Sequence, residues 1–81
     1  MQVLYFAWVR ERIGLAKEEV TTQAGTPAEL IAELSEKDPR YAAAFADISA
    51  LRVALDQELA DMDSSLENIR EVAFFPPMTG G

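Results

Sequence analysis

Two stretches of the chain are apolar at consecutive positions, a pattern typical of strands whose side chains are covered on both faces of a sheet. They are residues 3–9 and residues 72–75, the apolar part of a last strand predicted over 71–75. Because both favour the middle of a sheet, we expect them to lie side by side. A helix predicted between them permits a parallel pairing. The first stretch ends at residues 10–14, which are charged, close on a glycine and are expected to form a solvated loop.

Shorter alternating stretches predict three further strands. Residues 17–22 are polar with β-branched residues at their end, which favours an edge strand paired back to the first strand. Residues 51–55 alternate between apolar and other side chains. A turn at Asp56-Gln57 then allows residues 58–60 to return as a short strand.

A strong helix start follows the edge strand. Thr26 is a capping residue, Pro27 fits the first helical position, and Glu29 completes a capping box. Asp38-Pro39 ends the helix, because the residue before proline avoids the α region. The apolar face between these signals consists of Leu30, Ile31 and Leu34.

A second, short helical segment is predicted from the spacing of Tyr41, Phe45 and Ile48. The order of elements is therefore strand, strand, helix and several strands, with one main helix covering one face of a mixed sheet. This is an α+β fold of the β-grasp, or ubiquitin-like, type. The chain has 81 residues, so we expect a single domain over residues 1–81, with 76–81 as an extended C-terminal tail.

Composition excludes several kinds of chemistry. The chain has no cysteine and no histidine, which excludes a disulfide framework, the usual zinc ligands, a thiol nucleophile and a histidine-based triad. Its net charge of −7 argues against nucleic acid and is compatible with a partner that has a basic face, although plain solubility explains it equally well. No apolar run is long enough to span a membrane, and no signal peptide is recognised, so we expect the cytoplasm.

The acidic loop and the single tryptophan have ordinary structural interpretations. Asp61 and Asp63 lie in a polar loop without calcium-loop spacing, so no metal site is expected, and Leu66 after them is expected to point inward. Trp8 is either an interface anchor or, because of its place on an apolar strand, more readily a core residue.

The C-terminus carries the most specific signal. The last predicted strand is followed by Pro76-Pro77, a short spacer and Gly80-Gly81 with a free carboxylate. Proline keeps this stem extended, and glycine lets a backbone pass where a Cβ would clash. This order favours a terminus that enters another protein's site, with a frayed end as the alternative.

These residues resemble the small subunit of molybdopterin synthase, a ubiquitin-like sulfur carrier. The resemblance runs nearly the full chain, and its distinctive part is the strand at residues 71–75 with Pro76-Pro77 and the closing Thr79-Gly80-Gly81. Two turns depart from the family pattern. The chain has Asp56-Gln57 where an Asn-Gly or Asn-Gln step is common, and residues 68–70 replace a Gly-Asp turn.

The resemblance implies a sulfur-donor role without catalysis by the chain alone. An ATP-using activating enzyme would adenylate Gly81, a persulfide protein would supply sulfur, and the resulting thiocarboxylate would donate it to cyclic pyranopterin monophosphate in the large subunit. The chain itself would bind no cofactor. Gly80 and Gly81 would carry the reaction. The residues expected to fit the partner are Phe75, Pro76, Pro77, Met78 and Thr79.

Other functions stay open. A related carrier for thiamin thiazole synthesis also ends in Gly-Gly but usually lacks the Phe-Pro-Pro stem. A protein modifier joined to lysines through Gly81 has the same fold and tail. A binding module with no terminal chemistry is the third alternative. Phe75 itself is equally well explained as a core residue.

Overall fold

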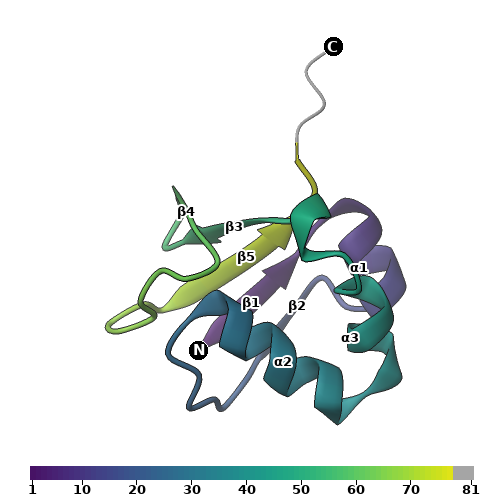
Figure 1. Ribbon diagram of the computed structural model, residues 1–81, viewed down its shortest axis with the longest axis horizontal. Helices are drawn as coiled ribbons and strands as arrows, with labels where there is room; N and C mark the ends of the chain where they lie inside the picture. The colour runs from purple at the N-terminus through teal and green to yellow at the C-terminus, as the bar shows by residue number, and fades with distance from the viewer. Residues whose placement is uncertain (78–81) are drawn as a thin grey trace.

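The computed structural model describes residues 1–77, which form five strands and a set of short helices (Figure 1). In chain order the elements are β1 Gln2–Tyr5, α1 Ala7–Ile13, β2 Lys17–Glu19, α2 Pro27–Lys37, α3 Pro39–Ala44, the 3₁₀ turn η1 Ile48–Ala50, β3 Arg52–Leu55, β4 Glu58–Ala60 and β5 Glu71–Phe75.

The strands form one mixed sheet in the order β2-β1-β5-β3-β4. The first and last strands lie side by side at its centre and run parallel, with Val3 opposite Val72 and Tyr5 opposite Phe74. All other pairings are antiparallel. The predicted β-grasp arrangement is therefore confirmed, and β2 is the predicted edge strand, although it ends at Glu19.

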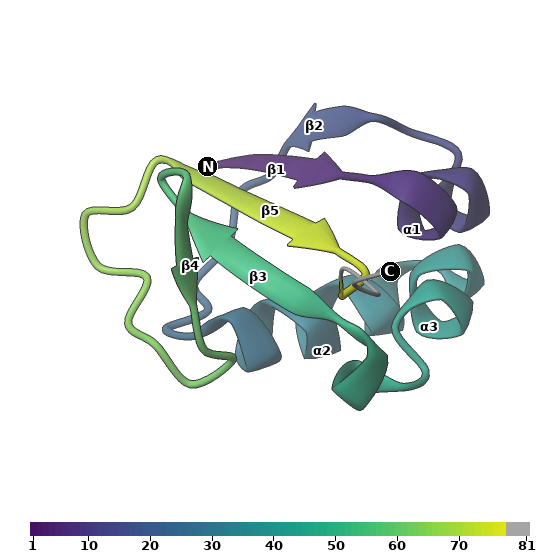
Figure 2. The same ribbon diagram turned by 90° about the horizontal axis from the view of Figure 1, so that it is seen from above.

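Helices α2 and α3 cover one face of the sheet, as the view from above shows (Figure 2). The core lies between these helices and the sheet. Tyr5 and Phe74 have almost no exposed surface, and their rings stack with centroids 6.4 Å apart. Phe45 of the segment after α3 meets Phe74 edge to face at 5.2 Å. The opposite face of the sheet carries no helix among the described residues, so the expectation that the central strands are covered on both sides is wrong.

The first strand is shorter than the sequence predicts. It ends at Tyr5, and residues expected to continue it, together with the expected charged loop, form α1. The reason is the burial of Val9 and Ile13, which lie one helical turn apart on the buried side of α1 and are 0% exposed. Gly14 ends the helix with φ of 88°, and its N–H donates to the carbonyl of Arg10.

Trp8 consequently lies on a helix and not on a strand. It is partly buried and packs against the margin of the core. The prediction that Trp8 lies on a strand is therefore wrong, and the prediction that it is a core residue is only partly right. The guanidinium of Arg12 lies 4.7 Å from the centre of the Trp8 ring, which is cation–π geometry.

The N-cap of α2 at Thr26 is confirmed, whereas the Glu29 side chain bonds to the residue before the cap and not to the cap itself. The Glu29 N–H donates to Thr26 Oγ1 at 3.2 Å, and the Glu29 carboxylate accepts from the Gly25 N–H at 2.6 Å. Asp38 is both the C-cap of α2 and the N-cap of α3, so the two helices meet at one residue. The buried apolar face of α2 includes Leu30, Ile31 and Leu34.

The second helical segment is only partly as predicted. Tyr41 and Phe45 are buried, but Ile48 lies in η1 and is 42% exposed. Leu66 points inward, as expected, and is 5% exposed.

Both atypical turns are accommodated by left-handed backbone. Asp56 and Gln57 have φ of 50° and 72°, the geometry of a two-residue hairpin turn. Asn68 has φ of 64°, as its residue type allows. The Asp56 carboxylate also accepts hydrogen bonds from the backbone N–H groups of Arg70 and Glu71 at 3.0 and 2.9 Å, so it joins the hairpin to the start of β5.

Candidate functional site

An apolar row crosses the uncovered face of the sheet. Leu4 of β1 is opposite Ala73 of β5, Ala73 is opposite Ala54 of β3, and Ala54 is opposite Leu59 of β4. The strand neighbours of Leu4, Ala54 and Ala73 are buried in the core, so these three side chains face away from the helices. Leu59 pairs with Ala54 and lies on the same side. Leu59 is 73% exposed. An apolar row left open on a small domain indicates a surface that another molecule covers.

This row leads into a groove of about 480 Å³ beside the end of β5. Its polar members, Gln57 and Glu71, stand among apolar side chains. The residues that line the groove are Leu4, Phe6, Ala7, Ala54, Gln57, Glu71, Ala73, Phe75 and Pro76. Phe6 is 46% exposed, a large apolar side chain left in contact with solvent. The groove is therefore an open, mostly apolar surface at the point where β5 ends and Pro76 begins.

The structure brings two of the expected partner-binding residues into the groove. Phe75 and Pro76 both line it and are partly buried, so Phe75 lies at the surface and not within the core. Pro77 is partly buried but does not line the groove. The remaining predicted site residues, Met78, Thr79, Gly80 and Gly81, lie outside the described residues.

Comparison with known proteins identifies the family of this sequence. The sequence model of the ThiS family matches residues 3–81.

The chain belongs to the ThiS family.

Curated relatives cover the whole chain. The molybdopterin synthase sulfur carrier subunit of Escherichia coli strain K12 is 40% identical over 81 residues, which is 100% of this chain and 99% of that protein. The protein of the same name from Haemophilus influenzae is 36% identical, with the same coverage. Among solved structures, small archaeal modifier protein 1 of Haloferax volcanii superposes with a TM-score of 0.73 at 22% identity, covering 96% of this chain and 97% of that one, a likeness in fold.

Sequence reasoning missed the inner part of the groove of this ThiS family member. The sequence predicts Leu4, Ala54 and Ala73 only as strand residues and Phe6 as part of a longer strand. The signal was present, because a strand that is apolar on both faces needs a cover on each. The sequence does not say whether the second cover is a helix of the same chain or another protein.

A cluster of polar side chains on the helix-covered side of the sheet joins β1, β2 and α3. The hydroxyls of Tyr5 and Tyr41 both donate to Oε2 of Glu18, at 2.7 and 2.5 Å. Burial is the main cause that raises the pKa of both tyrosines, and the bonds to the Glu18 carboxylate raise it further, to about 12 for Tyr41.

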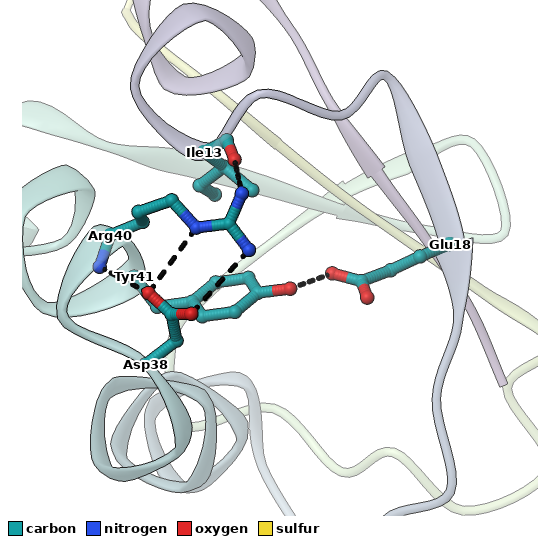
Figure 3. Close-up of polar contacts among 5 residues, drawn as sticks. All are labelled: Ile13, Glu18, Asp38, Arg40 and Tyr41. Atoms are coloured by element: carbon teal, nitrogen blue, oxygen red, sulfur yellow. Dashed lines mark hydrogen bonds and ion pairs between the residues drawn. The ribbon is translucent and has the colours of Figure 1, made fainter.

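A neighbouring contact ties α3 to the end of α1 (Figure 3). The Arg40 guanidinium donates to the carbonyl of Ile13 at 3.1 Å and pairs with the Asp38 carboxylate at 3.2 Å. Hydrogen bonds from the backbone N–H of Arg40, and then from its side chain, hold the pKa of Asp38 below its ordinary value. These contacts hold the helices that shape the site and carry no chemistry of their own.

Within residues 1–77 no group of three or more acidic side chains is arranged to hold a metal ion. In the same residues no helix has the length and apolar character needed to cross a membrane.

Proposed function

We propose that this chain is the sulfur carrier subunit of a molybdopterin synthase. The observation that carries the proposal is the end-to-end identity of 40% with the Escherichia coli protein of that name. The terminal Gly80-Gly81 after a Phe-Pro-Pro stem supports it, and so does the open apolar groove at the root of that stem. The cytoplasm is the compartment that fits the proposal.

The reacting group in this proposal is the carboxylate of Gly81. A carboxylate is a poor electrophile, so an activating enzyme first joins it to AMP from ATP and releases pyrophosphate. The terminal sulfur of a persulfide protein then attacks the carbonyl carbon and AMP leaves. A thiol cleaves the sulfur–sulfur bond of the resulting acyl disulfide, which leaves a thiocarboxylate on Gly81. The chain supplies the reacting group, and its partners supply acid–base catalysis.

Transfer takes place in the large subunit in this proposal. The tail enters that subunit's site, and the thiocarboxylate donates sulfur to cyclic pyranopterin monophosphate. The groove docks on the same subunit, with Phe75 and Phe6 as apolar anchors. Docking next to the tail's root fixes where the tail starts, so the reactive end reaches a defined place.

The test compares tail variants in two steps. Deletion of Gly81 moves the terminal carboxylate back by one residue, about 3.3–3.6 Å. Even an ångström of misplacement costs on the order of a hundredfold in rate. Gly81→Val adds a β-branched side chain where a narrow channel is expected. Both variants should lose thiocarboxylate formation and pterin conversion. Their melting temperatures should stay at the wild-type value.

Glu36→Ala, an exposed change on α2, is the matched control and should keep both activities. A Gly81-deleted protein that supports both steps at the normal rate would contradict the proposal. The intact mass of the protein from cells distinguishes the alternatives. An oxygen-to-sulfur exchange at the terminus supports the carrier, whereas isopeptide adducts through Gly81 support a protein modifier.

A further inference from the structure

Ala7 has an unusual backbone for its residue type. Its φ is 53°, in the left-handed region. The other non-glycine residues with positive φ among residues 1–77 are Asp56, Gln57 and Asn68, all in turns. Aspartate and asparagine tolerate this region, but alanine rarely adopts it because its Cβ crowds the following carbonyl. Such strain persists only where the surrounding structure determines it, and it is frequent at functional sites.

Contacts on both sides impose this conformation. The Phe6 N–H donates to the Phe74 carbonyl at 3.2 Å, so Phe6 still belongs to the central β1–β5 pairing. The Phe6 carbonyl accepts from the Val9 N–H at 3.1 Å, which is the first turn of α1. The chain must therefore change from strand to helix within one residue, Ala7.

The turn at Ala7 keeps the groove open. Side chains alternate along β1, with Tyr5 toward the core, so Leu4 and Phe6 face the open side. A strand continued in this register would place Trp8 on the same side, beside the groove. The left-handed turn instead carries the chain into α1. Phe6 is then the last side chain on the open side of β1, and it lines the groove together with Pro76.

We propose that Ala7 is a positioning residue, whose left-handed backbone and small side chain hold Phe6 as the wall of the groove on which the large subunit docks. This inference rests on the proposed function. A larger side chain at position 7 acts twice, because it disfavours the turn and it intrudes on the groove that Ala7 lines. Glycine adopts the same backbone freely and leaves the groove open.

The experiment is calorimetric titration of the full chain with the purified large subunit, at a temperature where circular dichroism shows every variant folded. Phe6→Ala should weaken binding by about tenfold or more, as loss of an aromatic anchor does. Ala7→Val should weaken it to a similar extent, and Ala7→Gly should stay within about threefold of wild type. The double variant Phe6→Ala/Ala7→Val should bind no more weakly than the worse single variant, because both changes remove the same contact.

Ile13→Val is the control for a merely structural role. It trims a buried side chain of α1 that is remote from the groove lining, so it should lower stability without changing affinity. Unchanged binding by Ala7→Val, a large loss in Ala7→Gly, or losses that multiply in the double variant would each overturn the inference alone. Failure of the wild-type chain to bind the large subunit would overturn the proposed function and the inference with it.

Discussion

Tyr41 donates its hydroxyl to Glu18 at 2.5 Å, and this contact fastens α3 to the edge strand β2. Tyr5 donates to the same carboxylate oxygen, so one glutamate serves two buried hydroxyls. Bonds to a charged acceptor are stronger than neutral ones, and an orphaned buried hydroxyl is costly. Because β2 has only three residues and pairs only with β1, we expect these hydrogen bonds to contribute to holding it in place.

Glu18→Gln should therefore destabilise the protein. The amide carries no charge, so the two hydrogen bonds that its oxygen accepts from the tyrosines are weaker than those to the carboxylate. We expect a loss of about 1–3 kcal/mol in the free energy of unfolding, measured by urea denaturation. Glu11→Gln, an exposed change on α1, is the control and should stay within about 0.5 kcal/mol. Equal stability of both variants would show that the cluster contributes nothing.

The same cluster predicts a loss of stability in alkali. The folded chain raises the pKa of Tyr41 from 10.0 to about 12, chiefly through burial and then through its bond to Glu18. Because the folded protein holds this proton more tightly than the unfolded chain, the contribution is complete below pH 10 and is lost as pH rises to about 12. Urea denaturation at a series of pH values should show this fall. Tyr41→Phe should make the fall shallower without abolishing it, because burial raises the pKa of Tyr5 in the same direction. An equally steep fall in Tyr41→Phe would contradict the assignment.

Leu34→Ala should remove a central contact between α2 and the sheet. Leu34 is 4% exposed, and truncation of a buried leucine costs about 2–5 kcal/mol through lost burial and the cavity left behind. Thermal and urea denaturation measure the change. Glu36→Ala on the exposed side of the same helix should shift stability by no more than about 0.5 kcal/mol. A similarly small effect of Leu34→Ala would show that the buried face is assigned incorrectly.

Asp56→Ala should loosen the junction between the hairpin and β5. The change removes the acceptor for two backbone N–H groups and puts alanine at φ of 50°. We expect a loss of about 1–3 kcal/mol by urea denaturation. Asp56→Asn keeps an acceptor oxygen and tolerates the turn, so it should recover most of that loss. Glu58→Ala in the same hairpin is the exposed control.

The sequence predicts well wherever a local signal and a tertiary requirement agree. Thr26, Pro27 and Glu29 mark the start of α2, and Asp38-Pro39 marks its end, because capping and proline sterics act within a few residues. The apolar runs at the two ends of the chain also predict the central parallel pair, since the most apolar strands occupy the middle of a sheet.

The candidate site divides in the same way. The stem at Phe75 and Pro76 is evident from the sequence, and the structure places both in the groove. Gly80 and Gly81 are predicted from sequence alone and lie outside the described residues. Leu59 and Ala54 are brought together with Leu4 only by strand pairing across the sheet, because they lie fifty or more positions from it in the sequence.

By itself, the sequence determined the order of the strands, the main helix with its caps and the central strand pair, because these depend on short-range sterics and on the amount of apolar surface. Only the tertiary structure decided that β1 stops at Tyr5 and that residues 7–13 are helical. The spacing of Val9 and Ile13 suits a helix, but the apolar run through residue 9 suits a strand equally well. Burial of both side chains in the core favours the helix, and the resulting gain offsets the strained backbone of Ala7.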